Sequence, residues 1–115
     1  MKPRLTLNIS RSFSKVPAGR YRTDGPQSGQ VFLEEKLLPA LENSDVVEVV
    51  LDGTDGFGSS FLDEAFAGLL RITAMSVAEF KRRVLLISEE DPTLIEEVEG
   101  YVEEEAARQS AAQAR

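Results

Sequence analysis

Apolar and polar positions along this chain follow two rhythms, one typical of strands and one typical of helices. Residues 5–9 read Leu-Thr-Leu-Asn-Ile, and this period of two predicts a half-buried strand. Residues 46–51 and 84–87 are short apolar runs that predict two further strands. Because 46–51 is almost wholly apolar and rich in valine, we expect it to be a central strand that is covered on both faces.

Two segments between the predicted strands repeat their apolar residues at the spacing of a helix. The first helix is predicted over 31–41, with Ser28 as its N-terminal cap. Pro39 lies inside it and lacks a backbone donor, so we expect a bend or a shortened last turn. The second helix is predicted over 61–70, directly after a glycine-rich link.

A third helix is predicted after the last strand. Asp91 is a capping carboxylate, and Pro92 suits the first helical position, so the helix begins there and has a buried face as far as Val102. Residues 106–115 are rich in alanine and have no apolar stripe, and we expect them to form a frayed helical tail.

Strands that alternate with helices at this spacing predict one α/β domain over residues 1–115. We expect two or three layers, with a mixed or mainly parallel central sheet packed with three to four helices. In such sheets the carboxyl ends of the strands form the working edge. The loops after Leu51 and Ile87 are therefore expected to lie at that edge.

Composition and charge narrow the function. The chain carries 13 basic and 20 acidic side chains, a net charge of −7, which argues against nucleic acid and anionic membranes as partners. It has no cysteine and no histidine, which excludes disulfides, the usual zinc sites and imidazole bases. No apolar run reaches the roughly 20 residues of a membrane span, and no signal-peptide core follows the start. We expect a cytoplasmic protein without a cofactor or a metal.

The link between the central strand and the second helix holds the first candidate site. Its glycines include Gly56 and Gly58, and Ser59, Ser60 and Asp63 follow. The spacing of Ser60 and Asp63 predicts a capping box, a purely structural role. A hydroxyl at a helix N-terminus is also accessible, and a phosphate placed on it is stabilised by the backbone amides and the helix dipole.

Two other sets of residues are candidates. Arg20, Tyr21 and Arg22 lie in the loop Gly19–Gly29, where two guanidinium groups suit a phosphate or carboxylate ligand, or pair with the protein's own carboxylates. Carboxylates near the link, Asp63 and Glu64 among them, would suit Mg²⁺ if they converged. Neighbouring residues on a helix point in different directions, which weakens that idea.

The link also carries a family resemblance. Residues 51–70, with Gly56-Phe57-Gly58-Ser59-Ser60, resemble a signature of a bacterial STAS-like family of unknown function. Residues 17–29 resemble its second signature, and 37–39 and 88–92 fit as well. The resemblance implies a STAS-like α/β fold and a distant relationship to anti-sigma-factor antagonists. In those regulators a serine at this turn is phosphorylated by a partner kinase.

Ser59 matches the phosphorylated position best, and Ser60 is next to it. The antagonist pattern has an aspartate and a glycine where this chain has Gly58 and Phe61, so the motif is not intact. From the position we predict a non-catalytic regulatory module that binds a protein, with an ATP-binding serine kinase as the partner that the resemblance implies. The predicted recognition residues are Gly58, Ser59, Ser60, Asp63, Arg20, Tyr21 and Arg22.

Two other functions remain open from the sequence. The first is a small-ligand or nucleotide-phosphate binder that uses the same glycine-rich turn with Arg20 and Arg22. The second is an enzyme that uses carboxylates and a divalent cation.

Overall fold

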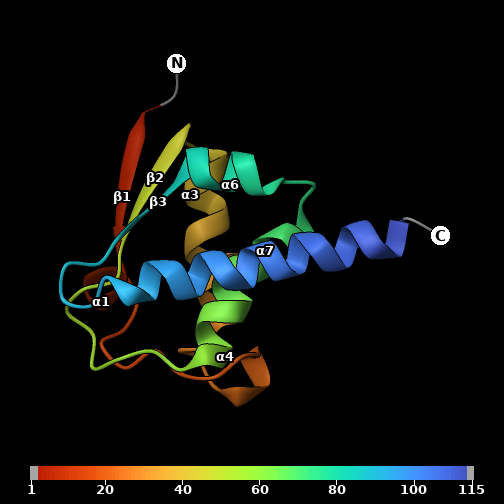
Figure 1. The fold of residues 1–115 in the computed structure, drawn as a ribbon. Helices are drawn as coiled ribbons and strands as arrows, with labels where there is room; N and C mark the ends of the chain where they lie inside the picture. Colours follow the sequence, from red (N-terminus) through yellow and green to blue (C-terminus); the bar gives the residue numbers. More distant parts are fainter. Residues whose placement is uncertain (1–2, 114–115) are drawn as a thin grey trace.

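A computed structural model of the protein describes residues 3–113 and has a parallel β-sheet against which helices pack (Figure 1). The strands are β1 (Arg4–Asn8), β2 (Val46–Val50) and β3 (Val84–Ile87). They lie in the order β1-β2-β3, with Leu5 opposite Val47 and Val47 opposite Val84. Both pairs are parallel, which confirms the predicted α/β fold with a mainly parallel sheet.

The connection from β1 to β2 contains the whole of the first predicted helix. Its elements are α1 (Ile9–Ser12), the 3₁₀ turn η1 (Arg22–Asp24), α2 (Gly29–Phe32), the π-helical turn η2 (Leu33–Leu37) and α3 (Leu38–Glu42). The Ser28 hydroxyl accepts from the backbone N–H of Val31 at 3.3 Å, so the predicted cap is confirmed. The π-helical turn ends at Leu37, two residues before Pro39, which lacks a backbone donor. The helix continues past Pro39 to Glu42.

The connection from β2 to β3 contains one predicted helix and one that the apolar pattern did not indicate. The predicted helix consists of α4 (Ser59–Leu62), the π-helical turn η3 (Asp63–Ala67) and α5 (Gly68–Ile72). The additional helix is α6 (Val77–Arg83), which is capped by the Ser76 hydroxyl on the backbone N–H of Glu79 at 3.1 Å. With α1, it brings the helices of residues 3–113 to more than the three or four expected.

The last helix is α7 (Thr93–Gln113), which crosses the other helices and extends beyond them at its C-terminal end (Figure 1). The Asp91 carboxylate accepts from the backbone N–H of Thr93 at 3.2 Å, as its predicted capping role requires. Residues 106–113 of the expected tail are helical, and the Gln109 amide donates to the Leu70 carbonyl at 3.1 Å. Fraying of this end in solution stays a prediction, and residues 114–115 lie outside the described residues.

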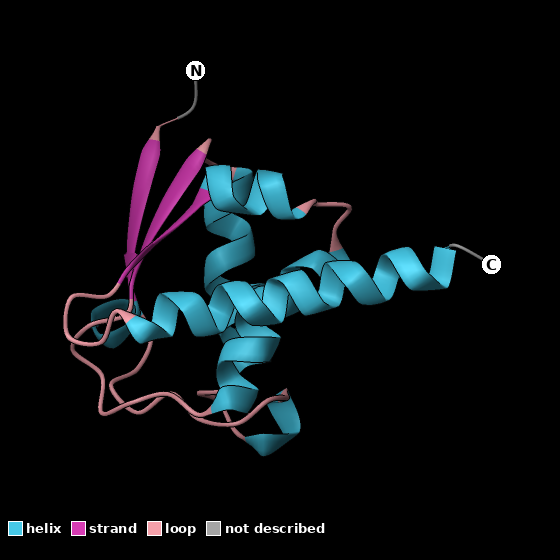
Figure 2. Ribbon diagram, in the orientation of Figure 1, coloured by secondary structure: helices cyan, strands magenta, loops and turns pink. Residues whose placement is uncertain are grey.

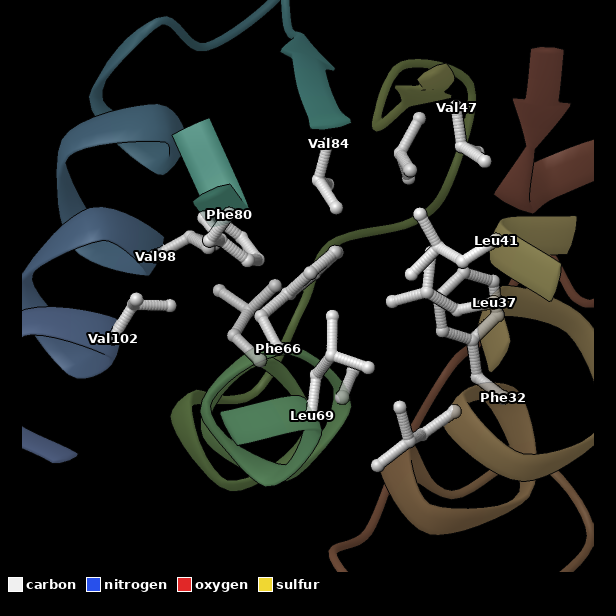
Figure 3. Packing of buried hydrophobic residues seen from close by; sticks show 14 of the residues in the cluster. Phe32, Leu37, Leu41, Val47, Phe66, Leu69, Phe80, Val84, Val98 and Val102 are labelled. Carbon is white, nitrogen blue, oxygen red and sulfur yellow. The ribbon is translucent and has the colours of Figure 1, made fainter. Parts of the chain in front are cut away.

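One hydrophobic core lies between the sheet and the helices (Figure 3). Phe32, Phe61, Phe66 and Phe80 come from α2, α4, η3 and α6 and are at most 1% exposed. Gly29 permits the close approach of α2 and α4, because a Cβ there would lie 2.5 Å from the Phe61 carbonyl oxygen. The small residue is thus needed for the crossing of these two helices.

Helices cover one face of the sheet and leave the other open (Figure 2). Val47 and Val49 are fully buried on the covered face, whereas Val46, Glu48 and Val50 alternate with them and are only half-buried. The expectation that this strand is covered on both faces was therefore wrong. Glu48 explains the difference, because its carboxylate accepts from the Thr6 hydroxyl at 3.0 Å on the open face and has no place in a doubly covered strand.

Candidate functional site

The link after β2 brings the two candidate serines to the start of α4. Gly53 and Gly56 have φ values of 89° and 129°, in the left-handed region that favours glycine. Gly58 is the residue that caps α4, so Ser59 and Ser60 are already helical and their side chains are exposed. Both hydroxyls are therefore accessible from solvent.

The predicted capping box of Ser60 and Asp63 is not present. Gly58 occupies the cap position, two residues before Ser60, and α4 has no side-chain capping hydrogen bond. The Asp63 carboxylate is instead used by another segment. Arg20 Nη1 lies 2.6 Å from Asp63 Oδ2 and 3.9 Å from Glu64 Oε1.

The Arg20–Asp63 pair joins the Gly19–Gly29 loop to the helix that follows the link. Both side chains are about 30% exposed, at 31% for Arg20 and 27% for Asp63, so the pair is partly shielded from water. The hydrogen bond to Asp63 raises the pKa of Arg20 above its usual value, and the negative charges of Asp63 and Glu64 act in the same direction. Arg20 is therefore held by the protein's own carboxylates.

The same loop is ordered by Asp24, whose Oδ2 accepts from the backbone N–H groups of Arg20 at 3.1 Å and Tyr21 at 2.9 Å. Arg22 donates to Glu34 at 2.9 Å and to Glu35 at 2.7 Å. Its hydrogen bond lowers the pKa of Glu34. The sequence allowed these arginines either to bind an anionic ligand or to pair with the protein's own carboxylates. The structure shows the second arrangement.

Tyr21 differs from its two neighbours in the loop. Its neighbours in the sequence, Arg20 and Arg22, both pair with carboxylates. The Tyr21 side chain, by contrast, is 51% exposed. Tyrosine is among the residues that contribute most to protein interfaces, since its ring offers a large contact area with few rotatable bonds. Tyr21 is thus an exposed aromatic side chain on an ordered loop that Arg20 joins to η3.

Tyr101 of α7 completes the site and was not predicted, because the helical pattern placed it on the buried face. Its hydroxyl donates to Glu97 at 2.5 Å. This hydrogen bond, then burial and the negative charges of Glu97 and Asp63, raise the pKa of Tyr101 to about 12, while a hydrogen bond with Ser59 opposes the shift. The Ser59 side chain therefore lies close to the Tyr101 hydroxyl. The available signal was that a buried tyrosine needs a partner for its hydroxyl.

A cleft of about 420 Å³ lies at the carboxyl ends of β2 and β3, the edge where the strand order predicted a working surface. Loops 52–57 and 88–91 line it together with the start of α7. Its lining includes five carboxylates and no lysine or arginine: Asp52, Asp55, Glu90, Asp91 and Glu97. Gly58, Ser59 and Ser60 do not line it, so the serine turn and the cleft are neighbouring but separate features.

Within 3–113, no three acidic side chains lie close enough together to bind one metal ion. Asp63 and Glu64 both form ion pairs with arginines, Asp63 with Arg20 and Glu64 with Arg71 at 3.2 Å.

The helices of residues 3–113 include none with both the length and the apolar character that a membrane span needs.

Comparison with known proteins identifies the family. A family model described as a STAS-like domain of unknown function matches residues 28–94, which is more than half of the chain and includes the serine turn. The Gly19–Gly29 loop lies almost wholly before the matched region. No curated protein and no solved structure matches the chain. The extent of the match and the parallel α/β fold agree with the resemblance of the turn, and the protein belongs to this STAS-like family.

Proposed function

We propose that this protein is a non-catalytic regulatory module that binds a protein partner. The binding surface consists of the exposed turn Gly58–Ser60 and the exposed side chain of Tyr21; we call it the turn surface. Phosphorylation of Ser59 by an ATP-dependent serine kinase, in the bacterial cytoplasm, switches the binding.

The observation that carries this proposal is the ion pair between Arg20 and Asp63. It connects two segments that are 43 residues apart and holds the Tyr21 loop beside the helix that begins at Ser59. An interface gains affinity when its parts are held in place before binding, because less conformational freedom is then lost. The pair therefore supports one preorganised surface rather than two independent loops.

The surroundings of Ser59 support a switch. A phosphate on Ser59 would accept from the free N–H groups in the first turn of α4. The phosphate would also lie one helical turn from Asp63. It could therefore compete with the Asp63 carboxylate for Arg20. The carboxylate of Glu97, which holds the Tyr101 hydroxyl beside Ser59, would repel it. Phosphorylation would thus change the partners of Arg20 and Tyr101 and alter the turn surface.

The small-ligand alternative has less support. Arg20 and Arg22, which would have held a phosphate, are already bound to carboxylates. Every charged side chain that lines the cleft beside the turn is negative, and these carboxylates repel nucleotides and sugar phosphates. Among the described residues we find no feature that favours a divalent-metal enzyme.

Phosphopeptide mapping of the protein purified from its own cells tests the switch. We expect a phosphate on Ser59, and none on the matched exposed serine Ser110 near the end of α7. The interaction is tested separately, by co-purification of partners with wild type, Ser59→Ala, Ser59→Asp and Ser110→Asp. A partner that binds wild type and Ser59→Asp equally would contradict the switch, and the absence of phosphate on Ser59 under all growth conditions would do the same.

A further inference from the structure

The uncovered face of the sheet carries an aliphatic surface that the hydrophobic core does not use. Val46 and Val50 of β2 and Leu85 and Ile87 of β3 are only half-buried, and none of the four belongs to the core cluster. The strand register pairs Val50 with Ile87 and Leu85 with Glu48, so the four side chains are neighbours on one face. We call this surface the open sheet face.

An open face is unusual for a sheet of this kind. All-parallel sheets occur almost only with both faces covered, since their strands are apolar on both sides. The longer helices of this protein lie to one side of the three strands (Figure 2). Contiguous apolar surface that is left in contact with water is typical of an interaction site.

The charge of the open sheet face points to its occupant. It carries one cation and one anion, Arg4 and Glu48, whose Nη2 and Oε2 atoms are 3.3 Å apart, so the face is neutral in a chain of net charge −7. Two copies that met through an acidic surface would repel each other. At this face a second copy would meet no net charge. In a two-fold contact, an approach of Arg4 of one copy to Glu48 of the other occurs twice.

We propose that a second copy of this chain covers the open sheet face, sheet against sheet, in a two-fold symmetric dimer. Sheets that pack face to face bury the side chains of their facing surfaces between them, as Val46, Val50, Leu85 and Ile87 would be buried here. The turn surface belongs to other elements, at the start of α4 and in the loop before α2. The dimer therefore does not depend on the proposed function.

The first test is the mass of the full chain in solution, measured by sedimentation over a wide range of concentrations. We expect a species of twice the 12.7 kDa of one chain. Leu85→Lys should convert it to the monomer, whereas Ile72→Lys should not, because Ile72 is 52% exposed on α5, away from the sheet. A wild-type chain that stays at 12.7 kDa up to its solubility limit would overturn the proposal.

A charge-reversal experiment tests the symmetry and does not depend on Leu85→Lys folding. Arg4→Glu and Glu48→Arg each place like charges against each other twice in the dimer, so each should raise the dimer Kd about tenfold or more. An equimolar mixture of the two variants brings opposite charges together and should dimerise as tightly as wild type. Circular dichroism checks that both variants fold. A mixture that associates no more tightly than either variant alone would overturn the two-fold contact.

Discussion

Arg20 Nη1 and Asp63 Oδ2 lie 2.6 Å apart and join a loop before the first long helix to the helix that follows the central strand. The contact engages an arginine that would otherwise suit an anionic ligand. It also holds the loop that carries Tyr21 against the helix that begins with the exposed serines. The proposed binding surface depends on this one contact more than on any other.

Loss of the Asp63 charge should release the loop. We expect Asp63→Asn to lower the free energy of unfolding by about 1 kcal/mol, since the pair is partly shielded. The variant keeps every trypsin site, so cleavage after Arg20 and Arg22 should become faster than in wild type. Limited trypsin digestion measures this, with Asp55→Asn as the control because Asp55 is exposed. Equal cleavage rates in all three proteins would show that the pair does not hold the loop.

The contact between α2 and α4 predicts a large effect of one methyl group. In Gly29→Ala the new Cβ would lie 2.5 Å from the Phe61 carbonyl oxygen and 3.0 Å from the Ala65 nitrogen, and these are backbone atoms that cannot turn away. We expect a loss of about 2–3 kcal/mol in the free energy of unfolding. Denaturant unfolding measures it.

Gly100→Ala is the matched control for that substitution. Gly100 lies within α7, and a Cβ there meets nothing within 4 Å. Alanine should therefore stabilise this helix by about 0.5–1 kcal/mol. If both variants moved stability in the same direction, the close helix crossing at Gly29 would be contradicted.

Glu105 of α7 forms ion pairs although its side chain is only 5% exposed. Its Oε1 accepts from Arg71 and from Arg108, each at 2.6 Å. Glu105→Gln keeps the shape but removes the charge that these arginines need, and we expect a loss of about 3 kcal/mol. Glu104→Gln is the control, because Glu104 is exposed on the same helix. Thermal unfolding of the two variants compares them; equal midpoints would contradict a structural role for Glu105.

Tyr101 gives the protein a dependence on alkaline pH. Its pKa is raised to about 12 from an ordinary 10.0, so the folded state favours the protonated phenol. This contribution to stability is fully present below pH 10 and is lost as the pH rises toward 12. Titration of the Tyr21→Phe variant at 295 nm follows Tyr101 alone, since the chain has two tyrosines and no tryptophan. A midpoint near 10 would contradict the hydrogen bond to Glu97.

The strands and the three long helices could be predicted because each has a repeating pattern of its own. The helix α6 could not, since its seven residues offer only Val77 and Phe80 as apolar neighbours of the core. The open face was missed for a related reason. The run of valines in β2 suggested burial on both sides, and only Glu48 indicated that one side is exposed.

The place of the serine turn, between the central strand and the second helix, was predicted, but its contacts were not. The spacing of Ser60 and Asp63 fits a capping box, but spacing does not fix where a helix begins, and the extended backbone of Gly58 takes the cap position. Contacts across 43 residues, such as Arg20 to Asp63, depend on how the helices pack. The same holds for Tyr101, which packing brings to Ser59.

The most direct test of the turn surface is site-specific photo-crosslinking in the protein's own cells. A photoreactive phenylalanine analogue replaces Tyr21 in one variant, Ser60 in a second and, as a control, Ser110 in a third. We predict that positions 21 and 60 crosslink to the same protein, that position 110 does not, and that Ser59→Asp changes the yield at both. Crosslinks from 21 and 60 to different proteins, or the same crosslink from 110, would contradict a single partner-binding surface.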